Sequence, residues 1–159
     1  MSTVDTPFAA AYELELNVDL PAAGGGPVQF FYPGAREAGS SDLLARVTPF
    51  DRDPWLANFA AGGFPLTAVT TCPDPNLFCA VVRGAGYMVR ADDAHVWSKV
   101  RAHPVQQVIP DLDHELVVVR GFHQDRGLWH WRLRMVGRLC SRRVKSLVTG
   151  GDGALDQRR

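Results

Sequence analysis

The amino-acid sequence predicts a mainly β fold: an antiparallel meander that forms a small sandwich or an incomplete propeller or barrel. Short apolar runs recur at intervals of about ten residues, and clusters of turn-forming residues separate them. The composition agrees, because 15 Gly and 11 Pro in 159 residues favour many short elements over a few long helices. At most one or two short helices are expected.

The N-terminal region is predicted to contribute a hairpin with a long loop. Apolar and polar side chains alternate over Tyr12–Val18, which is the pattern of a strand with one wet face. A glycine-rich turn follows, and Val28–Tyr32 is predicted as the second strand of the pair. A further short strand is expected over Leu43–Thr48.

One helix is favoured, over Trp55–Ala61. The apolar residues of this segment are spaced as in about two helical turns. Asp53 is a suitable N-cap with Pro54 in the first turn, and the Gly62–Gly63 pair is a suitable stop.

The middle of the chain predicts the meander itself. Each of its apolar runs ends at Gly, Pro, Asp or Asn, and consecutive hairpins leave no room for the crossover helices that parallel strands need. A further amphipathic strand is expected near the C-terminal end. The predicted strands are Leu66–Thr71, Leu77–Arg83, Gly86–Ala91, His95–Arg101, Val105–Ile109, Glu115–Gly121 and Leu128–Val136.

The charge of the chain changes sign near Gly121. Through Val119 there are 7 Lys and Arg against 14 Asp and Glu, a net charge of −7; the remainder has 10 against 3, a net charge of +7. We therefore divide the chain into a β-rich domain, residues 1–123, and a basic C-terminal segment, residues 124–159. The basic segment could bind an acidic partner, or it could neutralise the charge of the acidic β-rich domain of the same chain. A shifted reading frame after about Phe122 is a third explanation, which resequencing tests.

Several short motifs follow one another over about residues 66–123. They are Cys72–Pro73, Cys79–Val82, Gly86–Val89, Val96–Trp97, Pro104–Val105, Leu116–Val119 and Gly121–Phe122. Together they resemble a family of β-rich proteins without an assigned activity. This resemblance implies a propeller-blade-like or sandwich-like fold and no activity.

No motif predicts catalysis or a cofactor. No two histidines have the i, i+4 spacing of a zinc helix, and Cys72 and Cys79 lie outside the usual ligand spacing. The alternating acids of Asp111–Glu115 follow a proline and precede a Val run, which is typical of a turn. A hydrolase with an unrecognised site, for example Cys72 with a histidine brought near by folding, is the last of the alternatives. No metal or cofactor is expected.

The cysteine count and the N-terminus predict a cytoplasmic protein. Three cysteines are an odd number, and the first residues lack the positive and apolar regions of a signal peptide. No run of 18 apolar residues predicts a membrane span.

The sequence favours a non-enzymatic protein-interaction or scaffold domain. Aromatic side chains in turns are the candidate contacts, since Trp is enriched at interaction hot spots, although each could equally belong to the core. These candidates are Phe50, Trp55 and Trp97.

The alternative is a nucleic-acid or acidic-partner binder that uses the basic segment. Basic groups there interleave with Trp129 and Trp131, which suits phosphate contact with stacking, although a solvated strand face explains the same pattern. The candidate contacts are Arg132, Arg134, Arg138, Arg142, Arg143 and Lys145.

Overall fold

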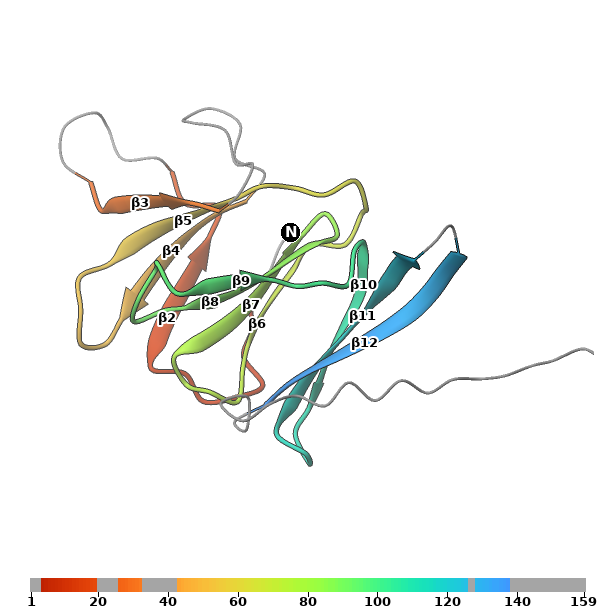
Figure 1. Cartoon of the computed structure of the whole chain (residues 1–159). Helices are drawn as coiled ribbons and strands as arrows, with labels where there is room; N and C mark the ends of the chain where they lie inside the picture. The colour runs from red at the N-terminus through yellow and green to blue at the C-terminus, as the bar shows by residue number, and fades with distance from the viewer. Residues whose placement is uncertain (1–3, 20–25, 33–42, 126–127, 138–159) are drawn as a thin grey trace, which may run out of the picture.

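The computed structural model describes residues 4–19, 26–32, 43–125 and 128–137, with side chains described as far as Gly121. This part of the chain is mainly β, with strands in three open sheets and no helix (Figure 1). Within it, no helix has the length and hydropathy that crossing a membrane requires.

The N-terminal sheet has the strand order β2-β4-β5-β3, namely Tyr12–Leu16, Leu43–Pro49, Trp55–Phe59 and Val28–Phe31. The predicted hairpin between the first two strands is wrong. β2 pairs antiparallel with β4, whereas β3 pairs parallel with β5, so β2 and β3 form opposite edges of the sheet. The buried residues of β4 and β5 suit the middle of the sheet, and β2, with one exposed polar face at Glu13 and Glu15, suits an edge.

The predicted helix over Trp55–Ala61 is also wrong. Residues Trp55–Phe59 form strand β5, which is buried along its whole length between β4 and β3. A short continuous apolar run is equally suited to a central strand that is covered on both faces. The pairing partners on both sides therefore decided the local structure.

The central sheet has the order β1-β6-β7-β8-β9, namely Val4–Asp5, Ala68–Thr71, Leu77–Val82, Ala85–Arg90 and Trp97–Lys99. The predicted antiparallel meander is confirmed from β6 to β9. The short strand β1 was not predicted and pairs parallel with β6. The β7–β8 turn holds Arg83 and Gly84 at positive φ, 45° and 80°, as a two-residue hairpin turn requires.

The C-terminal sheet has the order β10-β11-β12, namely Val105–Asp111, Leu116–Asp125 and Leu128–Gly137. All three strands were predicted, and both pairs are antiparallel. The ladder of β11 with β12 runs from Leu116↔Gly137 to Asp125↔Leu128. It therefore continues past residue 124, where the sequence analysis placed the start of the basic segment.

The central sheet is the middle layer between the other two sheets. One apolar core joins it to the N-terminal sheet, and a second core joins its other face to the C-terminal sheet. Strand β7 shows this directly: Phe78 and Ala80 belong to the first core, and Cys79 and Val81 to the second. A strand buried on both faces is apolar at successive positions, which explains the unbroken run of β7.

Candidate functional site

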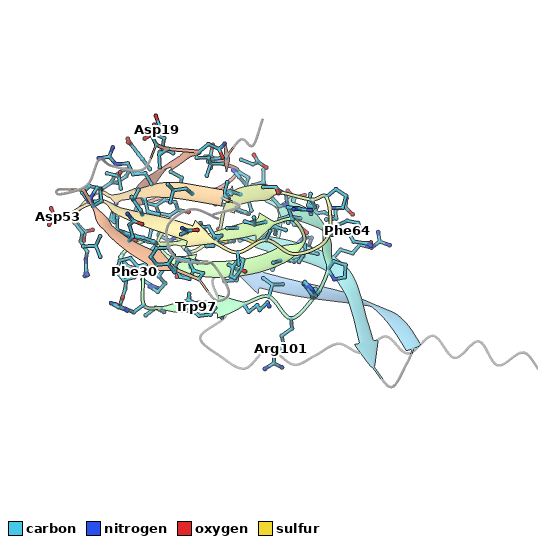
Figure 2. The ribbon with its side chains drawn as sticks, turned by 90° about the horizontal axis from the view of Figure 1, so that it is seen from above. Asp19, Phe30, Asp53, Phe64, Trp97 and Arg101 are labelled. Carbon is cyan, nitrogen blue, oxygen red and sulfur yellow. The ribbon has the colours of Figure 1, made fainter. Side chains whose placement is uncertain are left out.

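The edge strands β3 and β9 lie beside each other at one side of the first core. The ring of Tyr32, just after β3, meets the indole of Trp97 edge to face at 5.6 Å between centroids. Phe30 meets the imidazole of His95 in the same way at 5.0 Å. Figure 2 shows Phe30 and Trp97 along one margin of the molecule. Two sheets thus expose their edges at the same place.

This margin is apolar and open to solvent. The five residues from His95 to Lys99 are all exposed, including Val96 at 49% and Trp97 at 39%. On the β3 side, Val28 is 66% exposed. Alternation along a strand places Val28, Phe30 and Tyr32 on one face. We call this surface, made of Val28, Phe30, His95, Val96 and Trp97, the β3–β9 margin.

The margin rests on a rigid aromatic base. Tyr32 is 1% exposed, and its hydroxyl donates a hydrogen bond to the Ala94 carbonyl at 3.1 Å. Its ring stacks on Phe59 at 4.9 Å and lies 6.5 Å from that of Tyr87. Burial of its hydroxyl raises the pKa of Tyr32. Trp97 therefore packs against a buried, hydrogen-bonded ring and is still 39% exposed.

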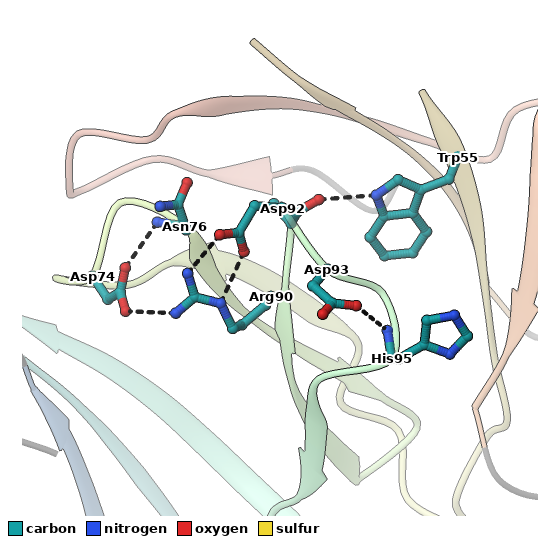
Figure 3. A network of polar contacts seen from close by, with 8 residues as sticks. Trp55, Asp74, Asn76, Arg90, Asp92, Asp93 and His95 are labelled. Atoms are coloured by element: carbon teal, nitrogen blue, oxygen red, sulfur yellow. Dashed lines mark hydrogen bonds and ion pairs between the residues drawn. The ribbon is translucent and has the colours of Figure 1, made fainter. Parts of the chain in front are cut away.

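The turn that leads into β9 is held by a polar network (Figure 3). The Arg90 guanidinium donates to both carboxylate oxygens of Asp92, at 2.8 and 2.6 Å, and reaches Asp74 at 3.4 Å. The Asp93 carboxylate accepts the backbone N–H of His95 at 3.0 Å. The hydrogen bonds from Arg90 lower the pKa of Asp92. These contacts join the β6–β7 turn to the β8–β9 turn and position His95.

Trp55, a candidate contact in the sequence analysis, instead belongs to the core. It is 6% exposed, and its indole Nε1–H donates to the Ala91 carbonyl at 2.9 Å. The ring of Phe30 covers it at 5.5 Å, edge to face. We therefore leave Trp55 out of the candidate surface.

Phe50 is 68% exposed in the turn between β4 and β5. Its backbone N–H donates to the Ala11 carbonyl at 3.1 Å, which ties the turn to the start of β2. In the described part of the chain, no ring contact joins Phe50 to another aromatic side chain. Phe50 is thus a single exposed ring, whereas Trp97 is one member of a cluster.

Among the basic candidates, two lie on a described strand. Arg132 and Arg134 belong to β12, where their backbone register partners on β11 are Gly121 and Val119. The other four, Arg138, Arg142, Arg143 and Lys145, lie outside the described residues.

The two described thiols lie inside the second core. Cys72 and Cys79 are fully buried, and burial raises the pKa of both thiols, that of Cys79 to about 12. A thiol in that state is a poor nucleophile at neutral pH. No group of three or more His, Cys, Asp and Glu side chains within the described ranges could hold a metal ion.

A shallow pocket between β6 and β10 likewise lacks a reactive pair. Its walls carry one carboxylate, that of Asp5, and no histidine or cysteine. The residues that line it are Asp5, Thr67, Ala68, Val69, Thr70, Val108 and Pro110.

The carboxylate of Asp111 stabilises the β10–β11 turn through contacts with His114. The Asp111 carboxylate accepts the His114 backbone N–H at 3.1 Å and lies 2.9 Å from its Nδ1. These contacts lower the pKa of Asp111. The predicted turn role of this aspartate is confirmed.

Comparisons of the chain with protein-family models, with curated proteins and with solved structures found no match. The functional argument therefore rests on the residues of the chain itself. The sequence analysis named Trp97 as a candidate contact and did not name Val28, Phe30 or His95. Strand alternation puts Phe30 and Tyr32 on one face of the Val28–Tyr32 segment and Phe31 on the other. Nothing in the local sequence shows that the face of Phe30 and Tyr32 meets β9.

Proposed function

We propose that the chain is a non-enzymatic β domain that binds another protein through the β3–β9 margin. The observation that carries the proposal is Trp97: its indole is 39% exposed and rests on the buried ring of Tyr32. A large aromatic side chain held rigid from below loses little conformational entropy on binding, which is the property of an interaction hot spot.

We further propose a sandwich-like arrangement of the three sheets as the scaffold of this surface. The two apolar cores on opposite faces of the central sheet support it. A rigid scaffold suits binding, because the free surface then has the shape that the partner recognises.

The test uses a photo-reactive amino acid in place of Val28, which is 66% exposed on the β3 side of the margin. A captured protein is then purified, and its affinity for the full chain is measured by titration calorimetry. We expect Trp97→Ala to weaken binding by at least about tenfold, which corresponds to a hot-spot truncation. The control, Phe50→Ala, also removes an exposed ring and should leave the affinity within about twofold. Equal affinities for wild type and Trp97→Ala would reject the proposal.

A second candidate function is the binding of nucleic acid or an acidic partner by the basic C-terminal segment. Its support is the excess of 10 Lys and Arg over 3 Asp from Arg120 onward. Electrostatic binding to phosphates weakens steeply as salt rises. The full chain should then bind single-stranded RNA at low salt, and a chain ending at residue 123 should not. Absence of binding by the full chain at low salt rules this candidate out.

A further inference from the structure

In the described part of the chain, β9 pairs with β8 on one side only. The Arg90 N–H donates to the Val96 carbonyl at 3.0 Å, and the Val100 N–H donates to the Gly86 carbonyl at 2.8 Å. Bonded pairs alternate along an antiparallel ladder, so Val96, Ser98 and Val100 face β8. The N–H and C=O groups of Trp97 and Lys99 therefore point away from the sheet, and β9 is its last strand.

The side chains along this edge have a definite chemical character. Trp97 and Lys99 pair with Val89 and Tyr87, which belong to the first core, so both side chains lie on the side of the N-terminal sheet. Arg101 follows at the same spacing and is exposed, and Figure 2 shows it further along the same margin. From Trp97 to Arg101 the edge thus presents one indole and then two cations.

The rest of the β-rich domain has the opposite charge. Through Val119 the chain carries 14 Asp and Glu against 7 Lys and Arg, and Lys99 and Arg101 are two of those seven. In the described part of the chain, the ion pairs involve Arg90 and His114 and neither of these two cations. An acidic ligand is therefore repelled by most of the domain and attracted to this edge.

We propose that the β3–β9 margin, together with Lys99 and Arg101 along the edge of β9, accepts an extended acidic segment of a partner protein. This segment adds to β9 as a further strand. The inference rests on the proposed function and names its ligand. Backbone hydrogen bonds to Trp97 and Lys99 supply affinity, and side chains of the added strand supply specificity. The added strand presents an apolar residue beside Trp97 and carboxylates beside Lys99 and Arg101, at alternate positions.

The experiment is a display selection of random 12-residue peptides on the immobilised full chain. We expect enriched peptides with alternating acidic residues and an apolar residue at one end of the acidic run. The same selection on Lys99→Glu/Arg101→Glu should lose this acidic enrichment, and Trp97→Ala should lose the apolar preference. Phe50→Ala is the matched control and should enrich the same peptides as wild type. Should the charge reversal unfold the chain, Lys99→Gln/Arg101→Gln provides the same comparison.

The peptide enriched most on the wild type is then synthesised and its affinity measured by fluorescence anisotropy. The charge-reversal variant should bind it at least about tenfold more weakly. N-methylation of single peptide amides should weaken binding at alternate positions only, because every second amide of an added strand bonds to β9.

Each of the following outcomes overturns the inference. Acidic enrichment that is insensitive to the Lys99 and Arg101 reversals would place the binding on the basic C-terminal segment. Uniform tolerance of N-methylation would exclude strand addition. A Trp97-dependent dimer in sedimentation without peptide binding would make a second copy the occupant. If the selected peptides depend on Trp97 but are not acidic, the proposed function survives and the inference fails; if nothing depends on Trp97, both fail.

Discussion

At the scale of single residues, the indole of Trp55 is fixed by one hydrogen bond and one ring contact. Its Nε1–H donates to the Ala91 carbonyl at 2.9 Å, and Phe30 packs against its face. The indole of Trp97 has a ring contact with Tyr32 and remains 39% exposed. The same side chain therefore stabilises the fold at one position and is available for binding at the other.

Substitution of the two tryptophans by phenylalanine should separate these roles. Trp55→Phe removes a buried donor, leaves the Ala91 carbonyl without its partner and opens a small cavity, so we expect a loss of about 2 kcal/mol in the free energy of unfolding. Trp97→Phe should change it by less than about 0.5 kcal/mol. Urea denaturation followed by circular dichroism measures both. A Trp55→Phe cost no larger than that of Trp97→Phe would contradict the core position.

The pair of Arg90 and Asp92 should make the domain sensitive to acid. The pKa of Asp92 is lowered by its hydrogen bonds to Arg90. A carboxyl group with a lowered folded-state pKa stabilises the fold above its ordinary pKa, and the contribution is lost as the pH falls through the folded value. At pH 7, Asp92→Asn should cost about 1 kcal/mol, since the pair is partly exposed and screened.

The measurement is the free energy of unfolding of wild type and Asp92→Asn at pH 7 and near pH 3. The difference between the two proteins should shrink at the lower pH, because the wild-type carboxyl group is then increasingly protonated. Asp113→Asn, at an exposed aspartate of the β10–β11 turn, is the control and should show little difference at either pH. A constant gap between wild type and Asp92→Asn would exclude the ionised pair as its source.

At the scale of elements, strand β7 is the clearest case of burial on two faces. Phe78 contacts Tyr12 and Phe59 in the first core, with ring centroids 5.8 and 6.4 Å apart. Val81, on the opposite face, belongs to the second core and is 0% exposed. A strand of this kind contributes apolar burial to two layers at once.

Truncation on either face of β7 should therefore be costly. We expect Phe78→Ala to lower the free energy of unfolding by about 4 kcal/mol and Val81→Ala by about 2 kcal/mol, through lost burial and residual cavities. Chemical denaturation checks both values. If Val81 faced solvent, its truncation would cost less than about 0.5 kcal/mol. Such a result would show that Val81 is not buried between the central and C-terminal sheets.

At the scale of the whole molecule, the three layers protect the groups between them. Cys72 and Cys79 lie in the core that joins the central and C-terminal sheets, and both thiols are fully buried. The high pKa of each adds a chemical barrier to the steric one. Their reactivity therefore reports on the contact between the two sheets.

In a Cys140→Ser background, Cys72 and Cys79 should react with a disulfide reagent at pH 8 only as fast as the protein opens. Val117→Asp places a charge in the same core and should speed the reaction by at least about tenfold, since an unpaired buried charge destabilises the layer. Absorbance of the released thiol follows the rate. Fast reaction of the native protein without Val117→Asp would show that the C-terminal sheet does not cover the central one.

Much of the strand structure could be predicted, but less of the site. Strand β7 and the first part of β11 were predicted, as Leu77–Arg83 and Glu115–Gly121, because turn residues bound their apolar runs. Trp97 was found as a candidate because it stands beside a turn. Trp55 was assigned to a helix, and its place as a surface contact or a core residue was left open, since neither its strand partners nor the residues that cover it are near it in the sequence.

For segments such as Tyr12–Leu16 and the hairpin turn at Gly84, the sequence by itself determined that strands form and where the chain turns. These properties are local, because they depend on the residues of each segment alone. Only the tertiary structure decided which strands pair, that β3 runs parallel to β5, and that β3 and β9 meet at one margin. Those features depend on contacts between distant segments, and the burial of Trp55 and exposure of Trp97 follow from them.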